Sequence, residues 1–337
     1  MIWFYDLSES ELRDVVKGLG LKEFVSTQLS AWLLARNISD PEKWSNISKD
    51  NREILSKNFS FKLSKIIRLD SDLSGNKKFL IELEDGNRIE SVLIKEKNHY
   101  TFCISSQVGC ALGCKFCATG NLGFKRNLTS GEIISQVLLL KKELNEYKGK
   151  INIVFMGMGE PLLNYDNLKR SLPVLTDEKG IGISSRRITI STAGILEGLK
   201  NLENDFPNVK ISFSLNGSDN DQRKNLMPIS GKEHLDDLIS YLRNRKRKNR
   251  ITFEYVLIDG INDSLADADK VSKLLRGIPS KINIIPYNPN SFVDFKTPSE
   301  KKITGFSEFL VKKGFTVMVR WSKGKDIRSA CGQLAGE

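Results

Sequence analysis

The stretch Cys110-Ala111-Leu112-Gly113-Cys114-Lys115-Phe116-Cys117 decides how the rest of this chain is interpreted. Three of the five cysteines lie here with the spacing C-x3-C-x2-C. Zinc ribbons pair their ligands as C-x2-C, and thiol redox sites use a single C-x2-C. Three thiolates from one short loop can bind three irons of a cubane cluster and leave the fourth iron without a protein ligand. The loop therefore predicts an iron–sulfur cluster at which a small molecule can be bound and reduced.

The alternative for this loop is a zinc knuckle or a set of buried free thiols. The adjoining residues offer no histidine or fourth cysteine that would close a tetrahedral zinc site. This disfavours the zinc alternative.

The composition is that of an ordinary water-soluble protein. The chain has 337 residues, of which 39% are hydrophobic and 28% charged, and its length suits about two domains. We find no apolar run long enough to span a bilayer and no secretory signal at the N-terminus. Clustered cysteines without a signal predict a cytoplasmic protein in a reducing compartment, with no membrane partner.

The charge balance predicts a polyanionic partner. The formal net charge is +11, which suits nucleic acid, although a merely basic soluble protein stays an open alternative. Histidine is scarce, with only His99 and His234. We therefore expect proton transfer to use carboxylates or thiols.

The chain begins with a segment of helical periodicity and continues with short strands. Residues 1–60 carry an N-cap at Ser8 and further apolar helical patterns over 22–37 and 49–59. Between residues 61 and 98 the period changes to that of strands, expected at 64–69, 78–83 and 88–94. The turn signal at 84–87 makes the last two a hairpin. We expect this β-meander to link the helical segment to the main domain.

From residue 99 onward, buried strands alternate with helices. The expected strands are 101–105, 151–156, 187–191, 209–214, 252–258, 282–285 and 315–319. The clearest helix starts at the capping box Thr129-Ser-Gly-Glu132. This alternation predicts an α/β fold of parallel units, and six or seven units without an eighth indicate an open or partial barrel. Ligands bind at the carboxyl ends of such strands, where the chemically distinctive segments of this chain all fall.

The flanks of the cysteine loop narrow the interpretation. The run Ser105-Ser-Gln-Val-Gly-Cys110, continued through Cys117-Ala-Thr-Gly120, resembles the radical S-adenosylmethionine (SAM) enzymes and, among them, the RlmN/Cfr family of RNA adenine methyltransferases. The resemblance implies a partial (β/α)6 radical SAM barrel. It also implies four parts, which are an RNA-contacting helical accessory domain at 1–60, the β-meander linker at 61–98, the radical SAM core at 99–320 and a C-terminal tail at 321–337.

The resemblance also implies a set of cofactor ligands. A [4Fe-4S] cluster would be held by Cys110, Cys114 and Cys117, and SAM would be bound by Gly159, Glu160, Ser191, Ser214, Leu215, Asn216 and Asn288. From the residues alone, Gly157-Met-Gly-Glu-Pro161 is either a tight strand-to-helix turn or a place where backbone approaches a ligand and a carboxylate binds an ammonium. Asn216 stands where the family usually has histidine, so its backbone is a better candidate contact than its side chain.

Three further residues receive catalytic roles from the resemblance. Cys331, within Ala330-Cys-Gly-Gln-Leu334, would carry the transferred methyl group, Cys103 would be the second thiol, and Glu90 the proton acceptor. Without the resemblance, a lone late cysteine is usually a small apolar or tail residue. Glu90 by its spacing alone would be a solvent-facing strand carboxylate.

The implied reaction is methylation of C2 of an adenine in 23S rRNA and in the tRNA anticodon loop, through S-methylcysteine and a 5′-deoxyadenosyl radical, ending in a Cys103–Cys331 disulfide. The implied enzyme is a monomer served by an electron donor such as flavodoxin or ferredoxin. One alternative is a Cfr-like enzyme that methylates C8, although Pro161 and Val108 favour C2. The other is a non-catalytic, metal-bound RNA-binding module.

Two groups of cations are candidates for RNA contact. The basic run from Arg243 to Arg250 is either a solvated helix end or a backbone contact. Lys125, Arg126, Arg186 and Arg187 are expected near the strand ends, where they could bind phosphates. The target adenine must be unstacked to react, so the substrate should be a loop or unfolded RNA.

Overall fold

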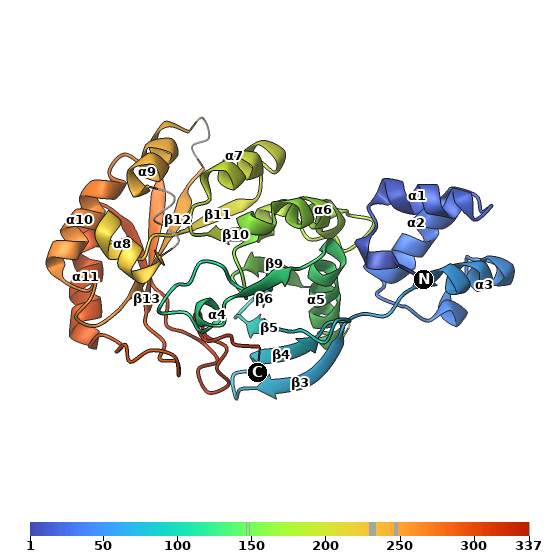
Figure 1. Ribbon diagram of the computed structural model, residues 1–337, viewed down its shortest axis with the longest axis horizontal. Helices are drawn as coiled ribbons and strands as arrows, with labels where there is room; N and C mark the ends of the chain where they lie inside the picture. The colour runs from blue at the N-terminus through green and yellow to red at the C-terminus, as the bar shows by residue number, and fades with distance from the viewer. Residues whose placement is uncertain (146, 148, 229–233, 246–248, 337) are drawn as a thin grey trace.

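A long open sheet forms the main body of the protein, with a helical module to one side (Figure 1). The computed structural model describes residues 1–145, 147, 149–228, 234–245 and 249–336. Within these residues the sheet has ten strands in the order β14-β13-β12-β11-β10-β9-β6-β5-β4-β3. The order starts at β14 and ends at β3, so the sheet stays open, as the number of predicted units indicated.

The parallel part of the sheet runs from β6 to β14. Each neighbouring pair in this part is parallel. The strands are β6 His99–Cys103, β9 Lys150–Phe155, β10 Ile188–Thr192, β11 Lys210–Ser214, β12 Ile251–Leu257, β13 Ser280–Pro286 and β14 Thr316–Val319. Their side chains are mostly buried because helices cover the outer face and loops cover the inner one, which is why the sequence shows apolar runs rather than alternation.

The predicted β-meander continues the same sheet. Strands β3 Lys65–Ser71, β4 Lys77–Glu82 and β5 Arg88–Lys95 pair antiparallel, and β5 pairs antiparallel with β6. The turn between β4 and β5 has Gly86 at φ +79°, a conformation that glycine adopts without strain. The antiparallel strands therefore extend the edge of the barrel sheet.

Helices connect the parallel strands, and all except α4, which lies on the cavity side beside the tail, lie outside them (Figure 1). They are α4 Ala118–Asn121, α5 Ser130–Glu143, α6 Tyr165–Thr176, α7 Leu196–Asp205, α8 Asn220–Leu226, α9 Leu235–Asn244, α10 Leu265–Leu275 and α11 Glu300–Lys312. The capping box expected at the start of α5 is confirmed, since Thr129 Oγ1 accepts from the backbone N–H of Glu132 and Glu132 Oε2 accepts from that of Thr129. Among the described residues, no helix combines the length and the apolar character needed to cross a bilayer.

The N-terminal module consists of α1 Glu9–Gly18, α2 Phe24–Ser30, a π-helical turn Ala31–Ala35 and α3 Lys49–Asn58. The single helix expected over 22–37 thus changes its hydrogen-bonding period at Ala31. The module is fixed to α5 by polar contacts. Asp6 Oδ1 accepts from the N–H of Gly131 at 2.7 Å, and Asn37 Nδ2 donates to the carbonyl of Leu138 at 2.8 Å. A side chain at position 131 would collide with Asp6, so this contact needs a glycine.

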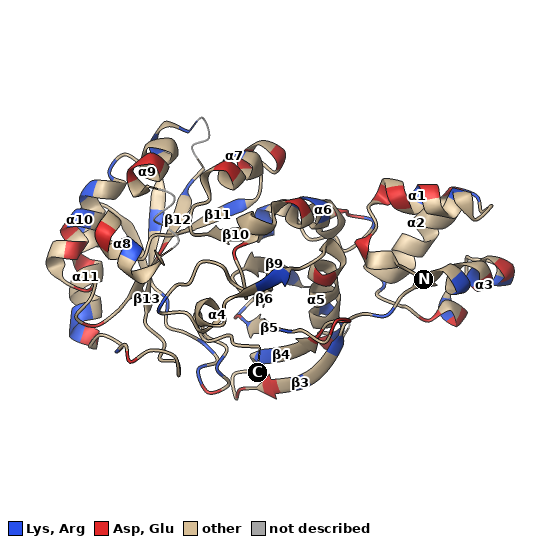
Figure 2. Ribbon diagram, viewed as in Figure 1, with Lys and Arg blue, Asp and Glu red and all other residues tan. Residues whose placement is uncertain are grey.

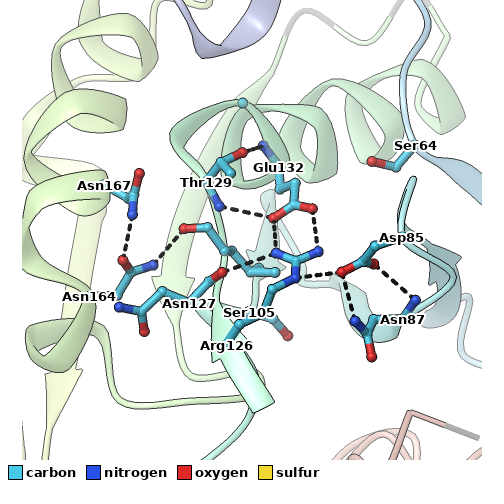
Figure 3. Close-up of polar contacts among 12 residues, drawn as sticks. Ser64, Asp85, Asn87, Ser105, Arg126, Asn127, Thr129, Glu132, Asn164 and Asn167 are labelled. Carbon is cyan, nitrogen blue, oxygen red and sulfur yellow. Dashed lines mark hydrogen bonds and ion pairs between the residues drawn. The ribbon is translucent and has the colours of Figure 1, made fainter. Parts of the chain in front are cut away.

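A short hairpin that the sequence pattern did not reveal carries Arg126 (Figure 3). It pairs β7 Gln107–Gly109 with β8 Phe124–Asn127. Arg126 donates two hydrogen bonds of 2.8 Å to Glu132 on α5 and one of 2.6 Å to Asp85 in the β4–β5 turn. Its guanidinium joins three elements, which gives Arg126 a structural role, and its contact with an RNA phosphate stays a prediction.

Two other predicted phosphate contacts lie in the wrong place. Arg186 and Arg187 belong to a 3₁₀ turn that directly precedes β10. They are therefore at the amino edge of the parallel sheet, whereas ligands bind at the carboxyl edge. Figure 2 shows Lys and Arg distributed over the helical module, the outer helices and the strands, so the excess positive charge is not confined to one element.

We predict that replacing Arg126 destabilises the fold. Arg126→Met would leave the buried carboxylate of Glu132 without its cation and should lower the free energy of unfolding by about 2 kcal/mol. Lys125→Met, on the same strand but exposed, is the matched control and should change it by less than about 0.5 kcal/mol. Urea unfolding followed by circular dichroism measures both. Equal midpoints for the two variants would contradict the role given to Arg126.

Candidate active site

A cavity of about 460 Å³ lies at the carboxyl ends of the parallel strands. Loops from the first parallel strand to the last contribute to it, together with the C-terminal tail. Nine of the predicted site residues line this cavity, namely Cys110, Cys114, Cys117, Gly159, Glu160, Ser191, Ser214, Asn216 and Cys331. Four do not, namely Glu90, Cys103, Leu215 and Asn288. The parallel topology thus brings together most of the residues chosen from the sequence.

The cysteine loop is fixed at both of its ends by backbone contacts. At its start, Gly109 has φ +75° and packs so closely on the hairpin that a Cβ atom would lie 1.9 Å from the carbonyl oxygen of Gly123. That same carbonyl accepts from the N–H of Cys110 at 2.9 Å. At its end, the N–H of Ala118 donates to the carbonyl of Gly332 in the tail at 2.8 Å.

The three loop thiols have the properties of cluster ligands. Burial raises the pKa of Cys110 to about 12 and raises the pKa of Cys114 and of Cys117 as well. Such thiols ionise only when a cation lies beside them, which a metal centre supplies. Leu112, Phe116 and other apolar side chains pack around them and would keep water away from a cluster. The donor set and its surroundings therefore fit a [4Fe-4S] cluster.

A search of the described residues finds no group of three His, Cys, Asp or Glu side chains spaced to hold one metal ion. A cubane cluster binds each thiolate at a different iron, so its cysteines need not meet at a single ion.

The segment Gly157–Pro161 is both a tight turn and part of the cavity wall. Gly159 has φ +99°, and a Cβ atom there would lie 2.6 Å from Cβ of Gln107. Glu160 follows with its side chain buried. Its Oε1 accepts from the N–H of Leu162 at 3.1 Å and its Oε2 from that of Ala193 at 2.7 Å. Burial raises the pKa of Glu160 to about 7 even though these hydrogen bonds oppose the shift.

The ends of β10 and β11 supply the other wall. Ser191 and Ser214 line the cavity near the carboxyl ends of their strands. Leu215 is buried behind them, and its N–H donates to the carbonyl of Glu254. Asn216 has φ +54°, a conformation that asparagine tolerates better than most residues.

The side chain of Asn216 is already used within the protein. Its Oδ1 accepts from the N–H of Val256 at 2.9 Å, and its Nδ2 contacts the sulfur of Met227 at 3.4 Å. These bonds hold the amide in place, which supports the view that its backbone is the better candidate for a ligand contact.

The C-terminal tail places Cys331 in the cavity. Asn288 Nδ2 donates to the carbonyl of Cys331 at 3.1 Å, and Thr119 Oγ1 donates to that of Leu334 at 2.6 Å. Cys331 is exposed to the cavity, and desolvation by the atoms around it raises the pKa of its thiol, while the nearby guanidinium of Arg320 opposes the rise. Asn288 therefore reaches the site through the tail, and its Oδ1 has no partner within the described ranges.

Cys103 ends β6 and is buried behind the cavity. Burial raises the pKa of its thiol, and the neighbouring thiol of Cys331 raises it further. The two cysteines are thus close enough to influence each other. All five cysteines are free thiols, so the disulfide expected between Cys103 and Cys331 has no support here and stays a prediction.

Glu90 lies in the middle of β5 and is only 1% exposed. The solvent-facing position that its spacing suggested is therefore wrong, because both faces of β5 are covered. Lys78 Nζ lies 2.9 Å from Glu90 Oε1, while Oε2 accepts from the N–H groups of Ala335 at 2.7 Å and Gly336 at 3.2 Å. The carboxylate is thus held between β4 and the tail.

Glu254 is a cavity residue that the sequence reasoning missed. It is buried on β12, and its Oε1 accepts from Ser212 Oγ and Asn283 Nδ2, whereas its Oε2 has no partner in the described part of the chain. The signal was present in the strand pattern, since Phe253 and Tyr255 pack into the core and so direct Glu254 to the inner face.

The three described cations of the basic run from Arg243 to Arg250 each have a partner within the protein. Arg245 forms a buried ion pair with Glu203 at 2.7 Å, and Arg243 and Arg250 donate to Leu274 and Thr316. Lys246, Arg247 and Lys248 lie outside the described residues.

The fold and the cysteine loop define a class of protein. Residues 104–270 match the family model of the radical SAM superfamily, and residues 3–60 match that of the ribosomal RNA large subunit methyltransferase N-terminal domain. A crystal structure of a radical SAM methyltransferase from Sphaerobacter thermophilus is 36% identical and covers all of both chains with a TM-score of 0.96.

Curated relatives narrow the class to one family. The probable dual-specificity RNA methyltransferase RlmN of Thermotoga neapolitana is 41% identical over 98% of this chain and 96% of its own. The dual-specificity RNA methyltransferase RlmN of Ruthia magnifica is 41% identical over 98% and 94%. The chain belongs to the RlmN family of radical SAM methyltransferases, whose cofactors are a [4Fe-4S] cluster and SAM.

We predict that Gly159→Ala weakens SAM binding. The new Cβ would overlap Gln107 and displace the turn that carries Glu160. Gly182→Ala is the matched control, because Gly182 also has positive φ but a Cβ atom there would meet its nearest atom, the carbonyl oxygen of Glu178, at an ordinary 3.8 Å. Both variants should lose about 1–3 kcal/mol of stability through backbone strain. Only Gly159→Ala should also lose affinity for SAM in equilibrium dialysis, and equal affinity in the two variants would contradict the role of the turn.

Proposed function

We propose that this protein methylates C2 of adenine in 23S rRNA and in the anticodon loop of tRNA, with Cys331 as the carrier of the methyl group. The observation that supports this most directly is the position of Cys331, which lines the same cavity as the three loop cysteines and Glu160. Adenine C2 is an electrophilic amidine carbon, so a direct transfer from SAM, which needs a nucleophilic acceptor, cannot methylate it. A carrier thiol beside a radical source overcomes this difficulty.

The loop thiols and the strand ends have separate tasks in this proposal. Cys110, Cys114 and Cys117 hold the [4Fe-4S] cluster, which when bound would supply the electron that cleaves SAM to a hydrogen-abstracting radical. Glu160 binds the ammonium group of SAM, since it is a carboxylate fixed by backbone N–H groups at the cavity wall. Gly159, Ser191, Ser214, Leu215, Asn216 and Asn288 complete the SAM site.

Cys331 and Cys103 act in sequence on the methyl carbon. The thiolate of Cys331 first takes a methyl group from SAM, forming a C–S bond and releasing S-adenosylhomocysteine. After hydrogen abstraction and addition to adenine C2, that carbon bridges Cys331 and the base. The adduct radical then loses one electron to a one-electron acceptor of the iron–sulfur class and its C2 proton to Glu90. Cys103 thiolate attacks the sulfur of Cys331, so an S–S bond forms, the C–S bond breaks, and the carbon keeps the electron pair and takes a proton to become the methyl group.

Glu90 accepts the C2 proton in this sequence. Its support is geometric, since the carboxylate is buried beside the tail that carries Cys331 and lies 2.9 Å from Lys78 Nζ. The scarcity of histidine agrees with a carboxylate in this role.

Substrate, partners and organisation belong to the same proposal. The curated relatives are named as dual-specificity RNA methyltransferases, and Pro161 and Val108 favour C2 over C8 chemistry. Residues 1–60 would contact RNA, 61–98 link them to the core at 99–320, and 321–337 form the tail. We place the protein in the cytoplasm, as a monomer reduced by a flavodoxin or ferredoxin.

We predict that Cys331→Ala abolishes methylation, whereas Cys103→Ala traps a covalent protein–RNA adduct. Without Cys331 there is no carrier, and without Cys103 the C–S bond to the base cannot be broken. Mass spectrometry of methyladenosines in rRNA and tRNA after anaerobic reaction, with denaturing gels for the adduct, gives both results. Product that is methylated at C8, or normal turnover by Cys103→Ala, would contradict the mechanism. RNA binding with no SAM cleavage would favour the non-catalytic module.

We predict that SAM binds more weakly as the pH falls below 7. The pKa of Glu160 is about 7 because of burial, and only its ionised form pairs with an ammonium. Affinity should therefore drop about tenfold for each pH unit below 7 and level off above it. Equilibrium dialysis between pH 5 and 7.5 measures this. Glu160→Gln should bind SAM weakly at every pH, and an unchanged pH dependence in that variant would show that another group titrates.

A further inference from the structure

Lys78 is a buried lysine that the reaction outlined above does not use. It is 5% exposed, on β4, and its Nζ lies 2.9 Å from Glu90 Oε1 and 3.9 Å from Asp70 Oδ2 on β3. The register pairs Leu80 with Glu90 and Lys78 with Val92, so Lys78 and Glu90 project from the same face of the sheet. Burying an ammonium is costly unless it is paired, which makes this ion pair the reason the lysine can lie there.

The two oxygens of Glu90 have partners of different kinds. Oε1 faces Lys78, whose strand is bonded to β3 on one side and β5 on the other and cannot move without breaking the sheet. Oε2 accepts from Ala335 and Gly336, which belong to the tail. A carboxylate can take a proton only at an oxygen that is open to the donor. Because Oε1 is held by a cation within the sheet, Oε2, whose partners are backbone N–H groups of the tail, is the oxygen that a substrate proton would approach.

A substrate proton can reach Oε2 only in place of the tail amides, and Lys78 is then the remaining partner of the carboxylate among the described residues. A buried carboxylate without any donor or cation is expensive and would turn away. The ammonium of Lys78, fixed on the sheet, holds Oε1 in place, so that Oε2 keeps its direction toward the tail.

We propose that Lys78 is a positioning residue, which holds Oε1 of Glu90 and so directs Oε2 toward the tail for removal of the C2 proton. This inference rests on the role of Glu90 in the proposed function. If the ion pair only stabilised the fold, its loss would reduce folding and every step of the reaction together. If Lys78 positions Glu90, its loss affects only the step at which the C2 proton leaves.

The experiment compares Lys78→Met, Lys78→Arg, Lys77→Met and Glu90→Gln with the wild type, all with a reconstituted cluster and full-length RNA. Lys77 is the matched control, because it is the next residue on β4, lies on the opposite face and pairs with Glu143 of α5. Four quantities are measured. They are methylation of Cys331 by mass spectrometry, 5′-deoxyadenosine formed, covalent protein–RNA adduct on denaturing gels, and methylated adenine.

In Lys78→Met we expect normal methylation of Cys331 and normal SAM cleavage, with adduct accumulating and methylated adenine per SAM cleaved falling at least roughly tenfold. Lys78→Arg keeps the cation and should restore release of the product. Lys77→Met should behave as wild type. In the Glu90→Gln background, adding Lys78→Met should cause no further loss, because Lys78 acts through Glu90.

The outcomes separate this inference from the proposed function. Failure of Glu90→Gln to accumulate adduct would overturn the role of Glu90 itself. Adduct in Glu90→Gln together with normal release in Lys78→Met would overturn the role of Lys78 alone. Equal loss of all four quantities in a folded Lys78→Met would show a structural pair and also overturn it. If Lys78→Met does not fold, Lys78→Gln, which keeps a donor without the charge, is measured in the same way and judged by the same outcomes.

Discussion

Parallel pairing of the strands from β6 to β14 is the constraint on which the site depends. Because every strand in this part points the same way, the loops that follow them meet at one edge of the sheet. The cysteine loop, the Gly159–Glu160 turn and the ends of β10 and β11 are far apart in sequence and still line one cavity. The tail then returns across this edge after β14 and adds Cys331. None of these segments could form the cavity alone.

Short sequence patterns with a known physical cause were sufficient to predict much of this arrangement. Apolar runs without alternation identified the buried parallel strands, and the capping box located the start of α5. The cysteine loop and the strand ends with glycine or polar residues contain nine predicted residues that line the cavity. The same approach failed where tertiary contacts decide. Arg126 is indistinguishable in sequence from an exposed cation, and only the approach of Asp85 and Glu132 determines its role.

The sequence also did not reveal that single polar residues on the antiparallel strands β3 to β5 are buried. Glu90 has the spacing of a surface residue. Nothing in β5 indicates that it is buried, because Ala335 of the tail that covers it lies 245 residues later in the chain. Lys78 was missed for the same reason, since its partner lies on another strand. Glu254 differs from these two. The alternation of Phe253 and Tyr255 around it was available, so a closer examination of the strand would have assigned it to the inner face.

The position of the last residues has a practical consequence for work with this protein. Gly336 donates to Glu90, so a group attached to the chain directly after these residues would lie close to the buried carboxylate and would crowd the tail. Met1 is 84% exposed and belongs to the helical module, away from the strand ends (Figure 1). Purification handles, fluorophores and surface attachment therefore belong at the N-terminus.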